Sequence, residues 1–290
     1  MHPSRDIIGK KGDELAGRKI VLGITGSVAA VKCVELAREL MRHGAEVRAV
    51  MSPAATELIT PILMHWATGN PVISELTGGI EHIELAKWAD LVLVAPTTAN
   101  TLGKVAYAID DTPVTSVVSV VLGLKKPILL VPAMHGSMYS SKLLQKNVSR
   151  VKEAGVHVLE PRLEEGKAKL PSVDEITGFA MDVLGPKDMD EMRVLVTAGP
   201  TVEYIDPVKL ITNRSSGKMG IAIARAAAAR GAEVTLVYGP GTEQPPENVR
   251  IIRVERTAEM RDAVVQELRK GQDIVVGTAA AQDFVVETPA

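Results

Sequence analysis

The sequence predicts an α/β protein with two Rossmann-like units in one chain. Short apolar runs alternate with amphipathic helical segments, which is the pattern of parallel strands joined by βαβ crossovers. The pattern restarts after residue 192, where a second apolar run with a glycine turn begins. In each half, a helical segment ends at a glycine that Ala-Glu-Val follows, at Gly44 and at Gly231. Because this echo occurs once per half, it indicates two similar units.

The first half is expected to hold five parallel strands with helices between them. The strands are expected at residues 19–24, 45–51, 90–96, 126–133 and 156–160. The segment 27–44 is expected to form one amphipathic helix, which ends at Gly44 because glycine is favoured just past a helix C-terminus. A short helix is expected around His82, before the third strand. These elements assign residues 1–184 to the first domain.

The second half begins after a polar segment at residues 184–192, whose proline and glycine are typical of a linker. Strands are then expected within 193–201, 232–240 and 273–284. The second domain is assigned to residues 190–290. Because the chain ends soon after the last of these strands, this domain is expected to be incomplete.

Composition narrows the range of functions. The 290-residue chain has a net charge of −2 and 3% aromatic residues, which argues against a nucleic-acid-binding surface. No apolar run approaches the roughly 20 residues that cross a bilayer, and the N-terminus lacks the apolar core of a secretory signal. The only cysteine, Cys33, allows neither an internal disulfide nor a cysteine-based metal site. The sequence therefore predicts a cytoplasmic protein that binds neither nucleic acid nor membranes.

Two turns in the first half have features of an anion site. "GITGSVAA" (23–30) follows the first strand, and its small residues let the backbone approach a ligand at a helix N-terminus. It is not G-x-G-x-x-G, so a tight turn with Ser27 as N-cap explains it equally well. Ser52 precedes Pro53 and is predicted to cap the next helix. A ligand phosphate can share that helix end.

Polar residues follow two later strands. "VAPTTANTLGK" (94–104) ends the third strand, and open α/β sheets bind ligands at the carboxyl ends of their strands. "VPAMHGSMYS" (131–140) follows the fourth strand, although its methionines are also typical of gap-filling residues in a loop. A lone histidine on a short helix, such as His82, is by itself more typical of a surface or packing residue.

Taken together, these segments resemble a known family. "GITGSVAA", "MSPAA", "HIELAKWAD", "APTTANT" and "PAMHGSMY" resemble, in order and spacing, the flavin-dependent cysteine decarboxylases. "TAGPTVEYIDPV", "TNRSSGKMG" and "TAAAQDF" are similar to the phosphopantothenate–cysteine ligase domain, and the motif around "SSGKMG" is highly specific to it. The two domains follow one another in bifunctional coenzyme A biosynthesis proteins. The resemblance covers residues 17–290.

For the first domain, the resemblance implies a flavodoxin-like fold that binds FMN. Its reaction converts 4′-phosphopantothenoylcysteine to 4′-phosphopantetheine. His82 matches the family's active-site histidine, and Met134 and His135 match its substrate-binding residues. The residues that match the FMN-binding segments are Gly26, Ser27, Ser52, Pro96, Thr97, Thr98, Ala99 and Asn100.

For the second domain, the resemblance implies that cysteine is joined to 4′-phosphopantothenate, which CTP with Mg²⁺ first activates as an acyl cytidylate. Asn213 matches the residue that handles this intermediate, and Asp283 is expected near the metal ion. The residues that match the nucleotide site are Gly199, Pro200, Thr201, Ser215, Ser216, Gly217, Lys218, Asp283 and Phe284. "SSGKMG" is not a Walker A loop, because Thr212 and Met219 occupy two of that motif's required positions. A helix N-cap with a close-packed glycine is the alternative interpretation.

Three features depart from the family pattern. His135 stands where most bacterial members have an asparagine that binds the substrate carboxylate. The flap "EEGKAKLPS" (164–172) lacks the cysteine that donates the final proton in bacterial enzymes, and Cys33 is not its equivalent by position. Either Lys167 or Lys169 replaces it, or "EEGKAK", which resembles the archaeal branch, is only a solvated charged flap. The chain also ends before the lysine loop of the ligases, so the ligase half is expected to be inactive.

Two alternative functions can be compared with the sequence. A flavin-binding protein without full decarboxylase turnover is compatible with the missing flap cysteine. A dinucleotide-dependent oxidoreductase is disfavoured, since neither first strand is followed by G-x-G-x-x-G. By resemblance, the decarboxylase domains form homotrimers with FMN at the subunit interface, where a neighbour contributes His82. Where the ligase domain is complete, ligase dimers link four trimers into a dodecamer, and without the complete domain free trimers are expected.

Overall fold

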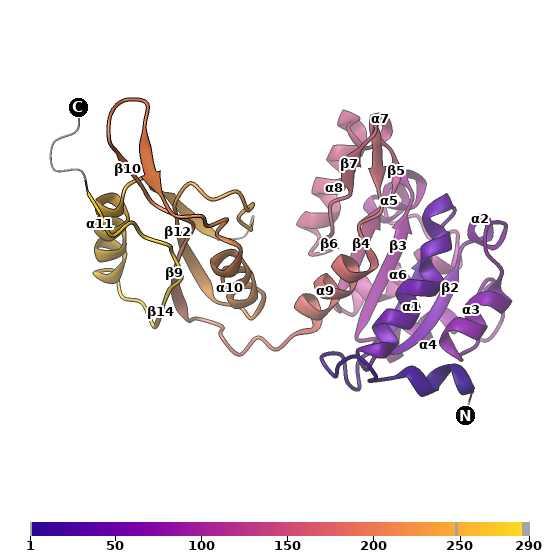
Figure 1. Cartoon of the computed structure of the whole chain (residues 1–290). Helices are drawn as coiled ribbons and strands as arrows, with labels where there is room; N and C mark the ends of the chain where they lie inside the picture. Colours follow the sequence, from indigo (N-terminus) through magenta and orange to yellow (C-terminus); the bar gives the residue numbers. More distant parts are fainter. Residues whose placement is uncertain (1, 247–248, 286–290) are drawn as a thin grey trace. The chain divides into compact units, whose positions relative to one another are not determined.

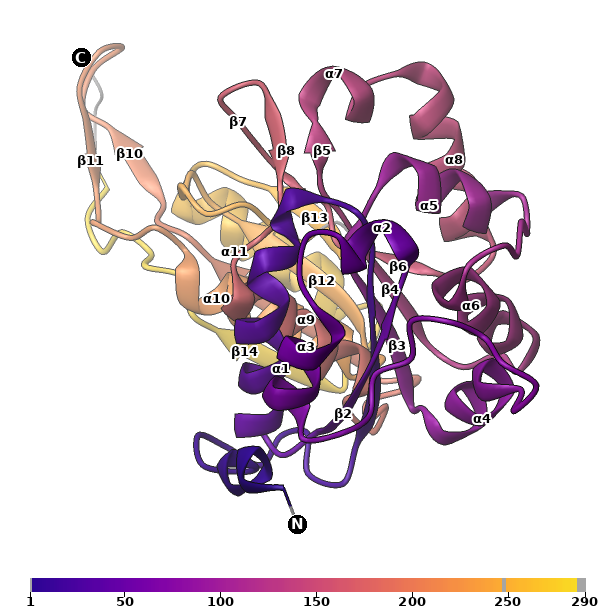
Figure 2. The same cartoon turned by 90° about the vertical axis from the view of Figure 1, so that its right-hand side faces the viewer.

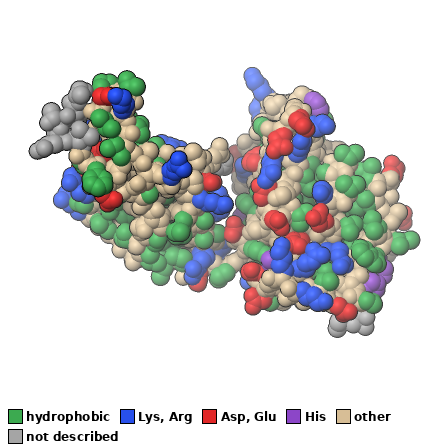
Figure 3. All heavy atoms as spheres, in the orientation of Figure 1, with side chains coloured by type: hydrophobic (Ala, Val, Ile, Leu, Met, Phe, Trp, Pro, Cys, Tyr) green, Lys and Arg blue, Asp and Glu red, His purple; other side chains and the backbone are tan. Residues whose placement is uncertain are grey.

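The computed structural model describes residues 2–246 and 249–285. The chain divides into two compact units, Met1–Leu184 and Gly185–Ala290, each of which is described by itself. Among the described residues, no helix is long and apolar enough to cross a membrane. On the face seen in Figure 3, basic and acidic side chains are interspersed, as the nearly balanced charge predicts.

The first unit is a five-stranded parallel sheet with helices on both faces (Figure 1). Its strands are β1 (Lys19–Ile24), β2 (Glu46–Met51), β3 (Leu91–Thr97), β4 (Ile128–Pro132) and β6 (His157–Val158). Its helices are α1 (Cys33–Arg42), α2 (Pro53–Thr56), α3 (Pro61–Thr68), α4 (Glu81–Trp88), α5 (Ala99–Ala106), α6 (Pro113–Gly123), α7 (Gly136–Tyr139), α8 (Lys142–Glu153) and α9 (Val173–Leu184), with 3₁₀ turns at Pro3–Ile7 and Val28–Lys32. The strand order β2-β1-β3-β4-β6 confirms the flavodoxin-like fold.

The strands of this sheet bury side chains on both faces. On β1, Ile20, Leu22 and Ile24 pack into the core under α1, α3 and α9. Val21 packs into the opposite core, under α4, α5, α6 and α8. Burial on both faces explains why these strands read as continuous apolar runs instead of alternating patterns. A one-residue slip would exchange the two faces, so the two cores together fix the register.

The helix predicted over residues 27–44 is divided in the structure. Ser27 caps a 3₁₀ turn over Val28–Lys32, and the α-helix begins only at Cys33. Val28 and Val31 of this turn are 79% and 63% exposed, and of its five residues only Ala30 is buried in the core. The C-terminus is as predicted, because Gly44 has a φ of 100° and closes the helix end.

A small antiparallel sheet lies beside α7 at one end of the first unit (Figures 1 and 2). It contains β5 (Met134–His135), β7 (Arg162–Glu164) and β8 (Lys167–Lys169), with β8 in the centre. The turn between β7 and β8 has positive φ at Glu165 (51°) and Gly166 (70°), as the favoured two-residue hairpin turn requires. The charged flap is therefore a hairpin paired with the segment after β4.

The second unit contains a four-stranded parallel sheet in the order β13-β12-β9-β14. Its strands are β9 (Arg193–Ala198), β12 (Glu233–Tyr238), β13 (Arg250–Arg253) and β14 (Ile274–Gly277), with a hairpin of β10 (Val202–Tyr204) and β11 (Leu210–Thr212). Its helices are α10 (Lys218–Ala229) and α11 (Thr257–Leu268). This order is one half of a doubly wound sheet, so the second Rossmann-like unit is confirmed.

A glycine sets the packing of α10 on β9. A Cβ added to Gly220 would overlap Ala198 Cβ and Thr278 Oγ1, so only glycine lets the helix lie this close to the sheet. The close approach brings the first turn of α10 to the carboxyl ends of β9 and β14.

The polar segment between the units is only partly a linker. Met189 is buried in the core of the second unit, and its N–H donates to Arg230 O at 3.1 Å. Arg230 also donates two hydrogen bonds of 2.7 Å to Asp188, and this pairing lowers the pKa of the Asp188 carboxyl. Asp188 and Met189 therefore fold with the second unit, ahead of the start expected at residue 190.

Candidate active sites

The loops after β1 and β3 meet where the strand order of the first sheet reverses. Open α/β sheets bind ligands at such switch points, and flavodoxin-like sheets place FMN there. The Thr25 hydroxyl joins the two loops, since it donates to Pro96 O at 2.6 Å and accepts from Thr98 N at 3.1 Å. Sequence reasoning did not select Thr25, because no motif rule distinguishes it from the rest of a buried strand end.

The loops after β1 and β2 end at the same edge of the sheet. As predicted, Ser27 and Ser52 cap the turns that follow, with hydroxyl oxygens 3.4 Å and 3.3 Å from the backbone nitrogens of Ala29 and Ala55. These are long hydrogen bonds, so a stronger acceptor can compete for the same N–H groups. Gly26 lies against α2, where a Cβ would come within 2.6 Å of a side chain.

The third predicted FMN segment has a buried part and an accessible part. Pro96 and Thr97 are buried, and the Thr97 hydroxyl donates to a carbonyl of β3 at 2.7 Å and accepts from an N–H of β4 at 3.2 Å. Thr98 caps α5 through its hydroxyl, while Ala99 and Asn100 form the first turn of that helix. Internal hydrogen bonds thus occupy the Thr97 hydroxyl, and the accessible groups lie at Thr98, Ala99 and Asn100.

His82 lies in the first turn of α4, which packs against α6 and β1. Its Nδ1 atom is buried and has no hydrogen-bond partner in the described structure. Since buried polar atoms are nearly always paired, this nitrogen fits a contact with a ligand or a second subunit. Across the described parts of the chain, no hydrogen bond joins His82 to the loops after β1, β2 and β3.

Met134 and His135 form β5, directly after β4. The residue before them, Ala133, donates its N–H to Thr97 O at 3.1 Å, and its carbonyl lies 3.5 Å from Ser27 Oγ. The predicted substrate residues therefore begin beside two of the predicted FMN loops.

Cys33 is buried at the start of α1, and its Sγ lies 3.1 Å from Ala95 O. Burial raises the pKa of this thiol to about 12, so it stays protonated at neutral pH. Cys33 is therefore an inert core residue, and the flap has no thiol of its own.

The second sheet has a switch point between β9 and β14, where three segments meet. Pro200 pairs with Ala280, whose N–H donates to Gly199 O at 2.9 Å. Asn213 Nδ2 donates to Ala280 O at 3.3 Å and to Ala281 O at 2.9 Å. Asn213 thus ties the loop before α10 to the loop after β14.

The loop before α10 presents backbone groups at the helix end. The N-cap is Gly217, with a φ of 83°, and this residue has no side chain of its own to cap the helix. The hydroxyls of Ser215 and Ser216 accept from Gly217 N and Lys218 N, both at 3.3 Å. The Lys218 side chain is exposed. Because both hydrogen bonds are long, an anion at this helix N-terminus can compete with the two serine hydroxyls for the N–H groups.

The remaining predicted nucleotide residues differ in accessibility. Thr201 is fully buried, and its hydroxyl accepts from Gln282 N at 2.8 Å. Asp283 and Phe284 are exposed, Phe284 by 73%. Within residues 2–246 and 249–285, no three His, Cys, Asp or Glu side chains form a metal site. Asp283 alone fits Mg²⁺ only where nucleotide phosphates supply further ligands, as is common for this ion.

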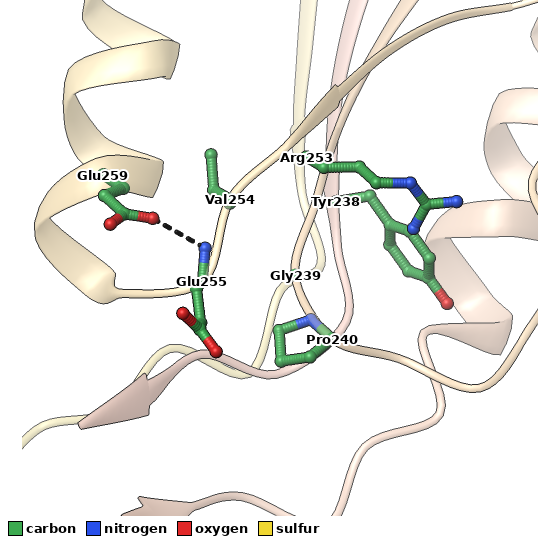
Figure 4. Close-up of a pocket in the computed structure, with 7 residues that line it drawn as sticks. All are labelled: Tyr238, Gly239, Pro240, Arg253, Val254, Glu255 and Glu259. Atoms are coloured by element: carbon green, nitrogen blue, oxygen red, sulfur yellow. Dashed lines mark hydrogen bonds between the residues drawn. The ribbon is translucent and has the colours of Figure 1, made fainter. Parts of the chain in front are cut away.

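Tyr238, which sequence reasoning missed, supports the loop before α10. Its hydroxyl donates to Ser216 O at 3.2 Å and to Glu243 O at 2.8 Å. Its ring also leaves no room for a Cβ at Gly217, which would lie 2.7 Å away. The same ring lines a pocket of roughly 350 Å³ with Arg253 (Figure 4). None of the residues that line this pocket was predicted to bind nucleotide.

Comparison with known proteins divides the chain into the same two domains. The Flavoprotein family model matches residues 8–185, and the model of the DNA/pantothenate metabolism flavoprotein C-terminal domain matches residues 189–290. The coenzyme A biosynthesis bifunctional protein CoaBC of Thermococcus kodakarensis is 52% identical over an alignment of 295 positions, which covers 100% of this chain and 73% of that protein. CoaBC of Escherichia coli is 38% identical, over 95% of this chain and 70% of that protein.

Solved structures match the first unit. The FMN-dependent cysteine decarboxylase SpaF has a TM-score of 0.52 at 28% identity, over 59% of this chain and 98% of that one. The peptidyl-cysteine decarboxylase EpiD has a TM-score of 0.51 at 25% identity, over 56% and 98%. Both family models and the CoaBC relatives lead to one conclusion: the chain belongs to the family of bifunctional coenzyme A biosynthesis proteins, with a flavoprotein domain followed by the pantothenate-metabolism C-terminal domain.

Proposed function

We propose that this enzyme of coenzyme A biosynthesis carries its decarboxylase and ligase activities at its two switch points. The ligase reaction assigned to the second unit forms 4′-phosphopantothenoylcysteine from 4′-phosphopantothenate, cysteine and CTP with Mg²⁺, and the inactivity expected of this half in this chain stays a prediction. The first unit then decarboxylates that compound to 4′-phosphopantetheine with FMN. The observation that carries the proposal is the position of the matching motifs, which follow the strands on either side of each switch point.

The first switch point fits FMN. Ser27, Ser52 and Thr98 start three turns at one sheet edge, and their hydroxyls and the backbone beside them suit a phosphate and a ribityl chain. When bound, FMN supplies reversible two-electron chemistry that makes loss of the cysteinyl carboxylate feasible. The protein's own task is to bind the substrate beside the flavin, through Met134 and His135, and to handle protons.

His82 is the proposed proton-handling residue. The ordinary titration range of a histidine lies near neutral pH, which suits general acid–base catalysis. Its buried, unpaired Nδ1 is available for a hydrogen bond to the ligand or to a neighbouring subunit. Removal of such a group typically costs about 10²- to 10⁴-fold in rate.

The first test is the visible absorption spectrum of the purified chain, with the released chromophore identified by mass. One FMN per chain is expected. A colourless protein that also fails to take up added FMN would remove the decarboxylase assignment. In the holoprotein, His82→Asn should keep the flavin spectrum and lose formation of 4′-phosphopantetheine. Full retention of product formation would contradict the role of His82.

In the second unit, Ser215, Ser216 and Lys218 are proposed to bind the CTP phosphates at the start of α10. Asp283 is proposed to share Mg²⁺ with those phosphates. Asn213 is proposed to contact the acyl cytidylate, because it lies between the loop before α10 and the loop after β14.

Calorimetric titration with CTP and Mg²⁺ tests this site. Lys218→Met should weaken CTP binding by about tenfold or more, the expected cost of one charge-assisted contact. Arg225→Met removes an exposed cation farther along the same helix and should leave the affinity within about twofold. If both variants weakened CTP binding equally, the loss would reflect the overall charge of the helix and not a phosphate site at Lys218.

The assembly proposed for the family is a homotrimer of first units, joined into a dodecamer through the second units. Val28, Val31 and Ile62 are 79%, 63% and 80% exposed, and such apolar side chains fit an interface. Ile62→Glu should lower the particle mass measured by light scattering. Leu124→Glu, at an apolar side chain elsewhere that is 43% exposed, should leave that mass unchanged. The proposed location is the cytoplasm, to be tested by cell fractionation.

A further inference from the structure

The flap places a lysine directly across from His135. In the antiparallel pair β5–β8, His135 stands opposite Lys167, and Met134 stands opposite Ala168. Directly opposed residues project from the same face of a sheet, with Cβ atoms about 5 Å apart. Ala168 is buried and Met134 packs against the same core. His135 and Lys167 therefore share the exposed face of this small sheet.

A backbone contact holds this arrangement in register. Gly136 N donates to Gly166 O at 2.9 Å, which fixes the hairpin turn to the segment after β5. A Cβ at Gly136 would come within 2.5 Å of that same carbonyl oxygen, so the close contact requires glycine. The position of Lys167 opposite His135 is thus set by backbone structure on both sides of the pair.

The two flap lysines differ in what they contact. Lys169 Nζ lies 2.7 Å from Glu165 and 3.4 Å from Glu164, and its hydrogen bond to Glu165 raises the pKa of this lysine. Lys167 also faces Glu164 across the hairpin, but the carboxylate of Glu164 pairs with Lys169. Within the described part of the chain, Lys167 has no ion pair, so its ammonium group is available to a ligand.

The hydrogen bonds of His135 leave its other ring nitrogen free to donate. Its Nδ1 accepts from Ser137 N at 3.3 Å and lies 2.8 Å from Ser137 Oγ. A nitrogen that accepts from a backbone N–H carries no proton, so this network assigns the ring proton of the neutral imidazole to Nε2. His135 thus contributes an N–H donor to the face that carries the Lys167 ammonium.

We propose that Lys167 completes the subsite for the carboxylate of the cysteinyl end of the substrate, in which His135 stands at the family's carboxylate-binding position, and that Lys167 makes this site selective for substrate over product. This inference rests on the proposed function of the first unit. Since β5 begins beside two of the FMN loops, the reacting end of the substrate lies here, and its phosphate lies at the other end of the molecule. The substrate and its decarboxylated product differ by one carboxylate. Loss of that anion as CO₂ removes the group that Lys167 holds, which favours product release.

Two unreactive ligands separate the contribution of the carboxylate. In 4′-phosphopantothenoylserine a hydroxyl replaces the thiol and the carboxylate is kept, whereas 4′-phosphopantothenoylethanolamine lacks the carboxylate. Calorimetric titration of the FMN-loaded enzyme measures both affinities. Lys167→Met should weaken binding of the serine compound by about tenfold or more and leave the ethanolamine compound within about twofold. Lys167→Arg should recover most of the lost affinity, because the positive charge is kept.

Lys169→Met is the matched control, since that lysine already pairs with two flap carboxylates, and it should leave both affinities within about twofold. The FMN content of all variants should be equal. Equal weakening of both ligands by Lys167→Met, or no weakening of either, would overturn the inference while the proposed function stands. If the FMN-loaded wild-type enzyme bound neither ligand, the proposed function would fail and the inference with it.

Discussion

The two switch points hold their loops together in similar ways but offer different groups to a ligand. In the first unit the Thr25 hydroxyl joins the loops after β1 and β3, and in the second the Thr201 hydroxyl accepts from the loop after β14. The turns around the first are capped by the N-cap residues themselves, Ser27 and Ser52. At the second, the N-cap of α10 is a glycine, and the hydroxyl comes from Ser216.

This difference shows that the sheet topology and the loops determine different properties of a binding site. Strand order fixes where a ligand binds, since both sites follow the reversal of strand order. The caps then decide which atoms meet the ligand. A phosphate at either site must share N–H groups with serine hydroxyls, while one at the second also meets the exposed Lys218 side chain.

The largest expected effect concerns the helix that presents the second site. Gly220→Val should lower the free energy of unfolding of the second unit by about 3 kcal/mol, because the side chain overlaps Ala198 and Thr278. Calorimetric unfolding and FMN content should show that the first unit is unchanged. Gly178→Val on α9 is the control, since a Cβ there meets nothing within 4 Å. Equal stability of the two variants would contradict the close contact.

The Thr25 contact tests the first site in the same way. Thr25→Val keeps the shape of the side chain but removes the hydroxyl, leaving a buried carbonyl and an N–H unpaired. We expect a loss of about 1–2 kcal/mol in unfolding free energy of the first unit and weaker FMN binding. Thr25→Ser, which retains the hydroxyl, should keep FMN affinity close to that of the wild type. Unchanged FMN affinity in the valine variant would mean that the Thr25 hydroxyl does not support the first site in the way proposed for Thr201 at the second.

A thiol reagent tests whether the first site works without a cysteine. Because burial raises the pKa of Cys33 to about 12, and the thiolate is the reactive form, iodoacetamide should not modify the folded protein or slow decarboxylation. The denatured chain should take up one label. Rapid labelling of the folded enzyme with loss of activity would mean that Cys33 reaches the reacting ligand.

The smallest expected effect is on the pH dependence of the second unit. Arg230 lowers the pKa of Asp188 in the folded state, so this carboxylate stabilises the fold above its unfolded pKa of about 4. That contribution is lost as the pH falls through the lower, folded pKa. Asp188→Asn should therefore destabilise the second unit slightly at pH 7 and have a decreasing effect below about pH 4. A stability difference independent of pH would rule out this carboxylate as the cause.

The sequence predicted the five strands of the first parallel sheet because burial on both faces makes them continuous apolar runs. It missed β13 of the second sheet, whose residues are mostly exposed. It predicted Ser27 and Ser52 as caps because N-cap rules are local. It could not predict the Thr25 contacts, which join residues 71 and 73 positions apart. Thr97 shows a further limit, because a motif gives the position of a residue but not the direction of its hydroxyl.

The resemblance located the loops of the second site in the same way, through local residue patterns. Tyr238 was missed because its support of the loop before α10 depends on a contact with Ser216, 22 positions earlier in the chain. Sequence reasoning also failed at the start of α1, where apolar residues follow a helical pattern but Val28 and Val31 are exposed.

Burial of Met189 has a practical consequence for producing the ligase half alone. The recognisable ligase pattern starts at the β9 strand, which invites a gene boundary close to residue 190. A polypeptide begun there would expose the apolar surface that Met189 covers and would leave Arg230 without its carboxylate. Expression from Gly185 keeps both, so the coding segment should be cut where the fold begins and not where the motif does.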